Sequence, residues 1–234
     1  ANNNLNIKTL AGNPAVPSRI TVTIGSGATV GASDRATAAL VSGALVAGTT
    51  VYIINNGTIQ GFGGKGSGTD GAGTNAGDAI STSVDLTIDN TSGYILGGGG
   101  GGGRGSPYDG GGISSAGAGG GGGGQGNPAG LKGTKIAVGG QDGADGVNGS
   151  ASSYGTGGAR GNNTFYGTYG GSGGRGGAAG EDGNDGGTNH LGQNLSGYTG
   201  TYLGRAAGKA IALNGNSVTW IAGNNSTQVA GAVS

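Results

Sequence analysis

Two runs of glycine decide how this chain is interpreted: LGGGGGGGRG at residues 96–105 and GGGGGG at residues 119–124. Glycine loses more conformational freedom on folding than any other residue, so such runs are usually flexible linkers. Here aromatic and charged residues interrupt the glycine-rich segment, and a strand-like stretch with the only tryptophan, VTWIAG at 218–223, follows it. A disordered linker stays an alternative, but these interruptions favour an ordered structure.

Around the runs, glycine recurs at every third residue, in GQDGADGVNG at 140–149, GGSGGRG at 170–176 and GEDGNDG at 180–186. This period matches an extended threefold helix that rises about 3.1 Å per residue and has no internal hydrogen bonds. Collagen uses the same period but is rich in proline, and the four prolines of this chain exclude it. Neighbouring polyglycine helices can instead pair their backbones with one another. The runs are therefore predicted to form a core made of backbone.

Four strand–turn–strand units flank this segment: RITVTIGSGATVG at 19–31, VYIINNGTIQG at 51–61, LTIDNTSGYILG at 86–97 and VTWIAGNNSTQVAG at 218–231. In the first, Ile20, Val22 and Ile24 alternate with polar residues, as in a half-buried strand. Chance similarity between short units is the alternative interpretation.

We therefore predict an all-β/irregular fold with almost no α-helix. A β-rung base of residues 1–96 plus 208–234 would carry an inserted polyglycine-II helix sandwich, residues 97–207, with recognition loops. Residues 33–45 are a weak candidate for one short helix, because Thr, Ser and Gly disfavour it.

Composition narrows the function. The 234 residues include 11 basic and 11 acidic side chains, and this balance argues against nucleic-acid binding. No apolar run approaches the 18 residues of a membrane span, and the absence of Cys excludes disulfides and thiolate metal sites. No catalytic pattern is found, so we predict a protein that is not an enzyme and binds no cofactor. The start at Ala1 without a signal peptide suggests a processed piece of a longer protein.

Candidate metal ligands are few. His190, the only histidine, has no carboxylate partner nearby in sequence and is expected to be a loop contact. Asp142 and Asp145, like Asp182 and Asp185, are three residues apart, so each pair would lie on one edge of a threefold helix. Calcium needs six to eight oxygen ligands and stays an alternative only where strands converge. A solvated acidic edge is the prediction.

Aromatic residues are concentrated in islands between the glycine runs. Together with Asn, Ser and Gly they have the composition of antibody loops, in which Tyr provides large contact area at low entropic cost. Helices of equal length would return the chain to one end, so the islands are predicted to cluster there. The residues predicted to carry recognition are Tyr108, Phe165, Tyr166, Tyr169, His190, Leu191, Tyr198 and Tyr202. For any single ring, packing over the end of a glycine bundle is the alternative.

Three motifs carry a family resemblance: VYIINNGTIQGFGGKGSG at 51–68, LTIDNTSGYILGGGGGGGRG at 86–105 and GKAIALNGNSVTWIAG at 208–223. They resemble the glycine-rich receptor-binding tips of tailed bacteriophages, including the adhesin that caps the long tail fibres of T-even-like phages. The resemblance covers about residues 17–234. It implies a sandwich of polyglycine helices whose variable distal loops bind outer-membrane proteins or lipopolysaccharide.

The resemblance also implies a virion protein at the distal end of a tail fibre or tail tip, in contact with the rest of the fibre. A monomer and a homotrimer both stay open. The N-terminal fibre-attachment domain of that adhesin is not recognisable here, which favours the tip of a longer protein over a separate cap. A glycine-rich ice-binding protein and a structural surface protein are the alternative functions, and a thermal hysteresis measurement would discriminate the first.

Overall fold

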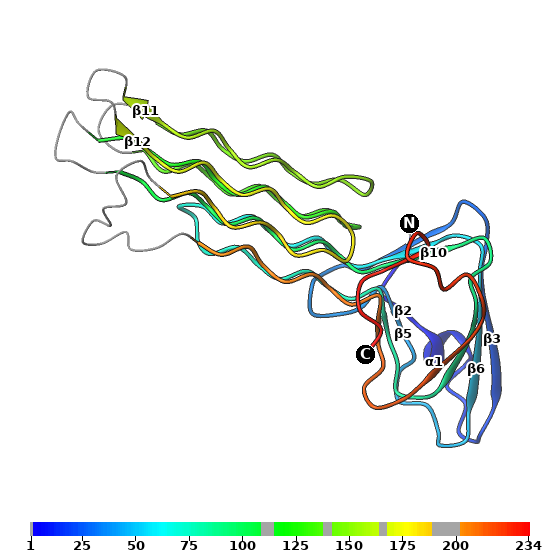
Figure 1. The fold of residues 1–234 in the computed structure, drawn as a ribbon. Helices are drawn as coiled ribbons and strands as arrows, with labels where there is room; N and C mark the ends of the chain where they lie inside the picture. The colour runs from blue at the N-terminus through cyan, green and yellow to red at the C-terminus, as the bar shows by residue number, and fades with distance from the viewer. Residues whose placement is uncertain (1, 109–114, 138–141, 164–167, 189–201) are drawn as a thin grey trace.

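The computed structural model describes residues 2–108, 115–137, 142–163, 168–188 and 202–234. It consists of a β-helix and a long array of extended, glycine-rich strands that projects from it (Figure 1). Within these ranges the one α-helix is α1 (Ile7–Leu10), and no helix there is long and apolar enough to cross a membrane. The predicted all-β/irregular fold with almost no α-helix is confirmed.

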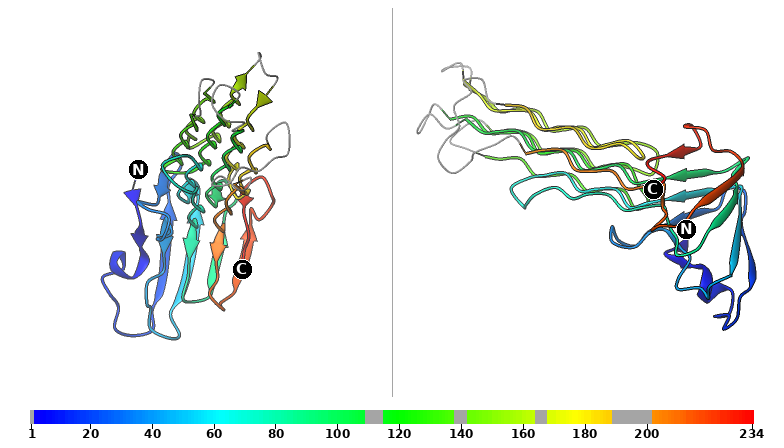
Figure 2. Two further views of the ribbon diagram at one scale, coloured as in Figure 1. Left: turned by 90° about the vertical axis from the view of Figure 1, so that its left-hand side faces the viewer. Right: turned by 60° about the horizontal axis from the view of Figure 1, so that its bottom comes forward.

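The β-helix has three parallel sheets, which the chain visits in the same order on each turn. Sheet 1 contains β1 (Asn2–Asn3), β4 (Thr29–Gly31), β7 (Thr58–Gln60), β10 (Tyr94–Leu96) and β15 (Val229–Ala230). Sheet 2 contains β2 (Leu5–Asn6), β5 (Leu40–Val41), β8 (Ile80–Ser81) and β13 (Ile211–Ala212). Sheet 3 contains β3 (Arg19–Ile24), β6 (Thr50–Asn55), β9 (Leu86–Asp89) and β14 (Val218–Ala222). Figure 2 shows these strands stacked beside one another.

Aliphatic side chains from all three sheets fill the interior of the β-helix. The parallel register places Val22 beside Ile53, Ile53 beside Ile88, and Ile88 beside Trp220. Corresponding columns run through Val30, Ile59, Ile95 and Val229 of sheet 1 and through Leu5, Leu40, Ile80 and Ile211 of sheet 2. Ile7 of α1 lies against the same cluster, with 1% of its surface exposed. Side-chain burial therefore stabilises this part of the molecule.

The four predicted units are the places where the chain passes from sheet 3 to sheet 1, as β3–β4, β6–β7, β9–β10 and β14–β15. Sheet 2 was not predicted, although GDAI at 77–80 and GKAI at 208–211 lead into two of its strands. The weak helix candidate at 33–45 was wrong. Residues 33–39 form a loop in which Asp34 accepts hydrogen bonds from the backbone N–H groups of Ala36 and Thr37, and β5 follows.

The glycine-rich strands leave the β-helix at the corner between sheets 1 and 2. We call them the glycine array, defined as the described residues of 61–77, 97–108, 115–137, 142–163, 168–188 and 202–209. The hydrogen-bond register in this array repeats every three residues. The N–H groups of strand 97–106 donate to three neighbours in turn: Gly98 and Gly101 to strand 71–77, Gly99 and Gly102 to strand 115–127, and Gly100 and Gly103 to strand 181–187. A repeat of three is the one predicted for polyglycine helices.

The two glycine runs are the central strands of the array. Strand 97–106 also accepts hydrogen bonds from three further strands, 61–68, 170–180 and 202–208, so it has neighbours on six sides. Strand 115–127 is surrounded in the same way, and residues 97–107 and 115–124 are all buried. A Cβ atom on Gly100 would lie 1.7 Å from the carbonyl oxygen of Arg205, and one on Gly103 equally close to that of Tyr202. Only glycine permits this spacing.

Strand 142–149, on the outside of the array, has glycine only on the side that faces inward. Gly143, Gly146 and Gly149 face the backbone of strand 115–127, while the residues between them carry side chains. The number of neighbours around a strand therefore explains whether glycine occurs in runs or at every third position.

Residues 61–77 also belong to the array. Gly64 N–H donates to the carbonyl oxygen of Gly99 and Gly66 N–H to that of Leu131, over 2.8 and 2.9 Å. The segment leaves and re-enters the β-helix at neighbouring points, because the backbone of Gly61 touches the carbonyl of Gly77. The division into domains 1–96 plus 208–234 and 97–207 stays a prediction, but these hydrogen bonds place part of 1–96 with the glycine-rich strands.

Candidate functional site

The end of the glycine array that points away from the β-helix is the candidate site, and we call it the distal end. The described strands that border the gaps at 109–114, 138–141, 164–167 and 189–201 end there (Figure 1). On the described flanks, Tyr108 pairs with Ala116, Ala118 pairs with Ile136, and β11 (Asn162–Asn163) pairs with β12 (Thr168–Tyr169). These strand ends lie together, whereas strand 61–68 turns back earlier, between Gly68 and Gly71.

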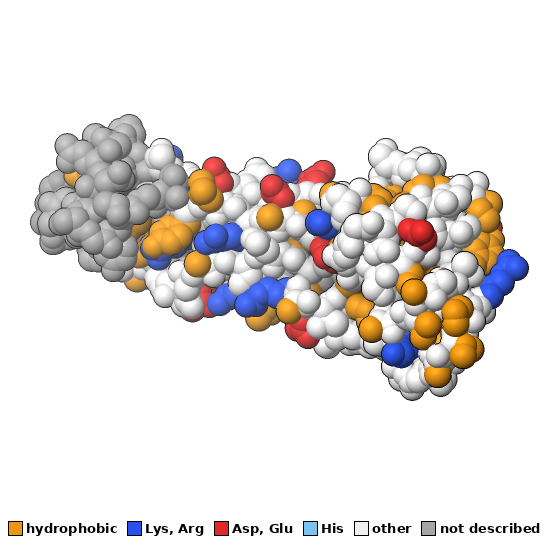
Figure 3. All heavy atoms as spheres, turned by 90° about the horizontal axis from the view of Figure 1, so that it is seen from below, with side chains coloured by type: hydrophobic (Ala, Val, Ile, Leu, Met, Phe, Trp, Pro, Cys, Tyr) orange, Lys and Arg blue, Asp and Glu red, His pale blue; other side chains and the backbone are white. Residues whose placement is uncertain are grey.

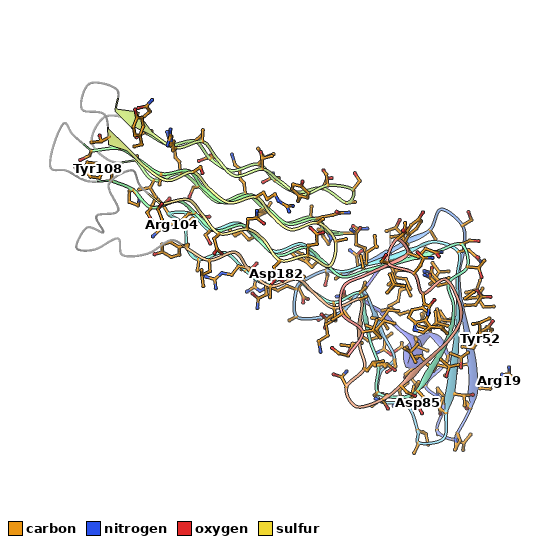
Figure 4. All side chains as sticks on the ribbon, viewed as in Figure 1. Arg19, Tyr52, Asp85, Arg104, Tyr108 and Asp182 are labelled. Carbon is orange, nitrogen blue, oxygen red and sulfur yellow. The ribbon has the colours of Figure 1, made fainter. Side chains whose placement is uncertain are left out.

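Three of the predicted recognition residues are described, and all three lie near the distal end. Tyr108 is half-buried and held by backbone hydrogen bonds to Ala116 of 2.9 and 2.7 Å (Figure 4). Tyr169 belongs to β12, and Tyr202 begins the strand that returns to the β-helix. Phe165, Tyr166, His190, Leu191 and Tyr198 lie outside the described residues.

Arg104 is a functional candidate that the sequence analysis missed. It is only 8% exposed, and its guanidinium carbon lies 3.7 Å from the centre of the Tyr202 ring. Gly98 and Gly101, earlier on the same strand, face the carbonyl oxygens of Phe62 and Lys65. That neighbouring strand turns back between Gly68 and Gly71, which leaves room for a side chain at position 104. As the one charged residue next to a glycine run, Arg104 could have been singled out from the sequence.

A second Arg–Tyr stack lies near the distal end, where the guanidinium carbon of Arg160 is 4.6 Å from the ring centre of Tyr169. Farther back along the array, Arg175 stacks on Tyr154 at 4.5 Å. Such contacts restrict the rotation of two long side chains. Tyr and Arg are enriched among the residues that dominate protein interfaces. The described residues at the distal end therefore include Tyr and Arg side chains that are held in fixed positions.

The first acidic pair is ion-paired rather than simply solvated, which corrects the prediction for it. Asp142 lies 2.8 Å from the ammonium of Lys135, and Asp145 lies 3.0 Å from that of Lys132. The backbone N–H of Lys135, followed by the Lys132 ammonium, lowers the pKa of Asp145. Asp142 raises the pKa of Lys135. Figure 3 shows acidic and basic side chains close together along the array.

The second acidic pair accepts backbone hydrogen bonds. Asp182 accepts one from the N–H of Ala207 and Asp185 one from that of Gly204, each over 2.7 Å. Both carboxylates therefore hold the returning strand 202–209 against the array. Across the described ranges, no group of three or more acidic, His or Cys side chains is arranged to bind a metal ion, so the calcium alternative gains no support.

The model of the family described as phage tail fibre adhesin Gp38 matches residues 1–234. The crystal structure of the gp37-gp38 adhesin tip complex of the bacteriophage S16 long tail fiber contains a similar chain, with a TM-score of 0.59 and 22% sequence identity. The similarity covers 99% of this chain and 78% of that one, and at this identity it shows the fold alone. No curated protein sequence matches the chain.

Proposed function

Because the chain belongs to the Gp38 family of phage tail fibre adhesins, we propose that its distal end binds a receptor exposed on the bacterial surface. As an adhesin of this family, it is a virion protein at the distal end of the tail fibre. Its role is attachment to the host and not catalysis. Family membership favours this function over the ice-binding and structural alternatives.

The proposal rests on the difference between the glycine runs at the centre of the array and the side chains at its distal end. The glycine runs at 97–103 and 119–124 leave no room for a Cβ atom, whereas the distal flanks carry Tyr108, Tyr169, Tyr202 and the two Arg–Tyr stacks. A rigid backbone core can present loops of many sequences without repacking. We propose the extracellular loops of an outer-membrane protein as the receptor, with lipopolysaccharide as the second candidate.

We further propose that the β-helix end faces the rest of the tail fibre. The similar S16 chain was crystallised as part of a complex of two fibre proteins. Sheet 3, with Arg19 and Tyr52 on its outer face, lies at the end of the molecule opposite Tyr108 (Figure 4). This polarity would leave the distal end free to contact the host.

Adsorption assays on hosts that each lack one surface structure test the receptor class. Loss of binding on a strain without one outer-membrane protein supports the protein receptor, and loss only on strains with truncated lipopolysaccharide supports the second candidate. The double variant Tyr166→Ala and Tyr198→Ala should weaken binding by about 30-fold or more, as expected for loss of interface anchors.

Tyr154→Ala is the matched control, because this tyrosine lies on the side of the array away from the distal end. It should leave adsorption unchanged. Normal binding by a folded Tyr166/Tyr198 double variant would show that these rings pack over the strand ends, and would contradict their proposed role.

A further inference from the structure

A notch of about 400 Å³ lies where the glycine array meets the outer face of sheet 1. One wall is a row of outward side chains in parallel register, Thr29, Thr58 and Tyr94. The other wall is the turn at residues 150–153 of the array, which contributes Ala151 and Ser152. Notches between two parts of a protein are frequent ligand sites, and this volume is within the usual range.

Both walls are held in place by hydrogen bonds. Tyr94 N–H donates to the carbonyl oxygen of Gly57 over 2.9 Å, and its own carbonyl accepts from Nδ2 of Asn55 over 3.1 Å. Nε2 of Gln60 and Nε2 of Gln125 each donate to the carbonyl oxygen of Ala151, over 3.0 Å. The notch is therefore formed before any ligand arrives, which lowers the entropic cost of binding.

The lining combines one aromatic ring with apolar and neutral polar residues. Tyr94 is 45% exposed. Thr29, Thr58, Ser152 and Asn127 line the notch around it, together with Leu96, Ala151, Gln60 and Gln125, and none of these described lining residues is charged. A sugar ring has one face of C–H groups, which packs on an aromatic ring, and an edge of hydroxyls, which needs hydrogen-bonding partners. An anionic ligand would find no charge partner here.

We propose that this notch binds a neutral oligosaccharide, with one sugar ring stacked on Tyr94 and its hydroxyls bonded to the Thr, Ser and Asn side chains. It is a second attachment site, on the side of the molecule and separate from the distal end. The proposal rests on the proposed function only in taking the bacterial surface as the source of the sugar. That source is either the polysaccharide of lipopolysaccharide or a capsular polysaccharide.

Titration of the purified protein with each polysaccharide, followed by NMR or calorimetry, tests the proposal. The two probes are the lipid-free polysaccharide released from host lipopolysaccharide by mild acid and the purified capsular polysaccharide. We expect one of them to bind with a dissociation constant on the order of 1 mM. Tyr94→Ala should weaken this binding by about tenfold, whereas Tyr94→Phe, which keeps the ring, should retain it.

Two further variants separate the site from general effects on folding. Ser152→Trp fills the notch from the opposite wall without changing sheet 1, and it should abolish binding. Tyr52→Ala removes a tyrosine from the outer face of sheet 3, where the array forms no second wall, and it should have no effect. Absence of binding to either polysaccharide, or binding unaffected by both Tyr94→Ala and Ser152→Trp, would overturn the proposal.

The outcome is distinguishable from failure of the distal receptor site. The Tyr166/Tyr198 double variant should bind the polysaccharide normally while losing receptor-dependent adsorption. On hosts that carry the receptor, Tyr94→Ala should instead keep receptor-dependent adsorption while its binding to the polysaccharide is weakened.

Discussion

The β-helix and the glycine array are both built from extended parallel or antiparallel strands, yet their interiors have opposite chemistry. In the β-helix, columns of Ile, Val and Leu fill the space between three sheets. In the array, carbonyl groups lie where a Cβ atom would have to fit, and backbone hydrogen bonds take the place of side-chain packing. A strand can therefore be buried on two sides by side chains, but on six sides only where side chains are absent.

The contrast has a consequence for substitutions. Side-chain cores lose stability when atoms are removed, because a cavity remains. A backbone core should instead lose stability when a single carbon is added. The two regions are therefore expected to respond in opposite directions to a change in side-chain size.

The largest effect is expected from Gly100→Ala in the central strand. The new Cβ would overlap the Arg205 carbonyl oxygen at 1.7 Å, and backbone on both sides prevents relaxation. We expect destabilisation of the array by more than about 4 kcal/mol, measured by denaturant unfolding and native proteolysis. Gly25→Ala, where a Cβ would meet nothing within 4 Å, is the control. Equal stability of the two variants would refute the backbone core.

Ile53→Ala should produce the next largest effect. Ile53 is fully buried between Val22 and Ile88, and removal of three carbon atoms should cost about 3 kcal/mol. Ile53→Val should cost only about 1 kcal/mol. Thermal and denaturant unfolding of the two variants measure the difference. A cost below that of Ile53→Val would show that this core can collapse around the cavity.

Asn55→Ala tests a polar exception inside the β-helix. Asn55 is fully buried, and its Nδ2 donates to Oδ1 of Asn90 over 2.7 Å, while its Oδ1 accepts from Gly57 N–H over 3.1 Å. Nδ2 also donates to the Tyr94 carbonyl, so three partners would each lose a hydrogen bond, and we expect a cost of about 2 kcal/mol. Equilibrium unfolding provides the measurement. If the variant is as stable as the parent, water or a neighbour must satisfy Asn90.

The smallest effect is expected on the surface of the array, from Asp145→Asn. Exposed ion pairs contribute little, so the loss should be below about 1 kcal/mol. Because the pKa of Asp145 is lowered from 3.8, its contribution is present above that value and disappears as the pH falls through the folded-state pKa. The stability difference between parent and variant, followed by denaturant unfolding, should therefore narrow below pH 3.8. A stability difference that stays constant as the pH falls below 3.8 would exclude ionisation of Asp145 as its cause.

Much of the fold followed from local patterns. The alternation of Ile20, Val22 and Ile24 predicted β3, since one buried face leaves a period of two, and the turn residues between short β-rich runs predicted the passages from sheet 3 to sheet 1. Sheet 2 escaped notice because β5, β8 and β13 have two residues each, too short to show any period. Of the candidate site, Tyr108, Tyr169 and Tyr202 were predicted at the distal end. The Arg–Tyr stacks were not, because the local sequence does not show which ring a guanidinium will contact.

The spacing of glycine along the chain specifies which segments can be surrounded by other strands. A run of glycine tolerates neighbours on all sides, and a glycine at every third residue tolerates them on one side, since no Cβ stands in the way. Only the tertiary structure decided which strands became those neighbours. Backbone N–H and C=O groups are the same in every residue, so nothing local distinguishes one partner from another. The inclusion of 61–77 in the array and the room for Arg104 beside it depend on where distant strands end.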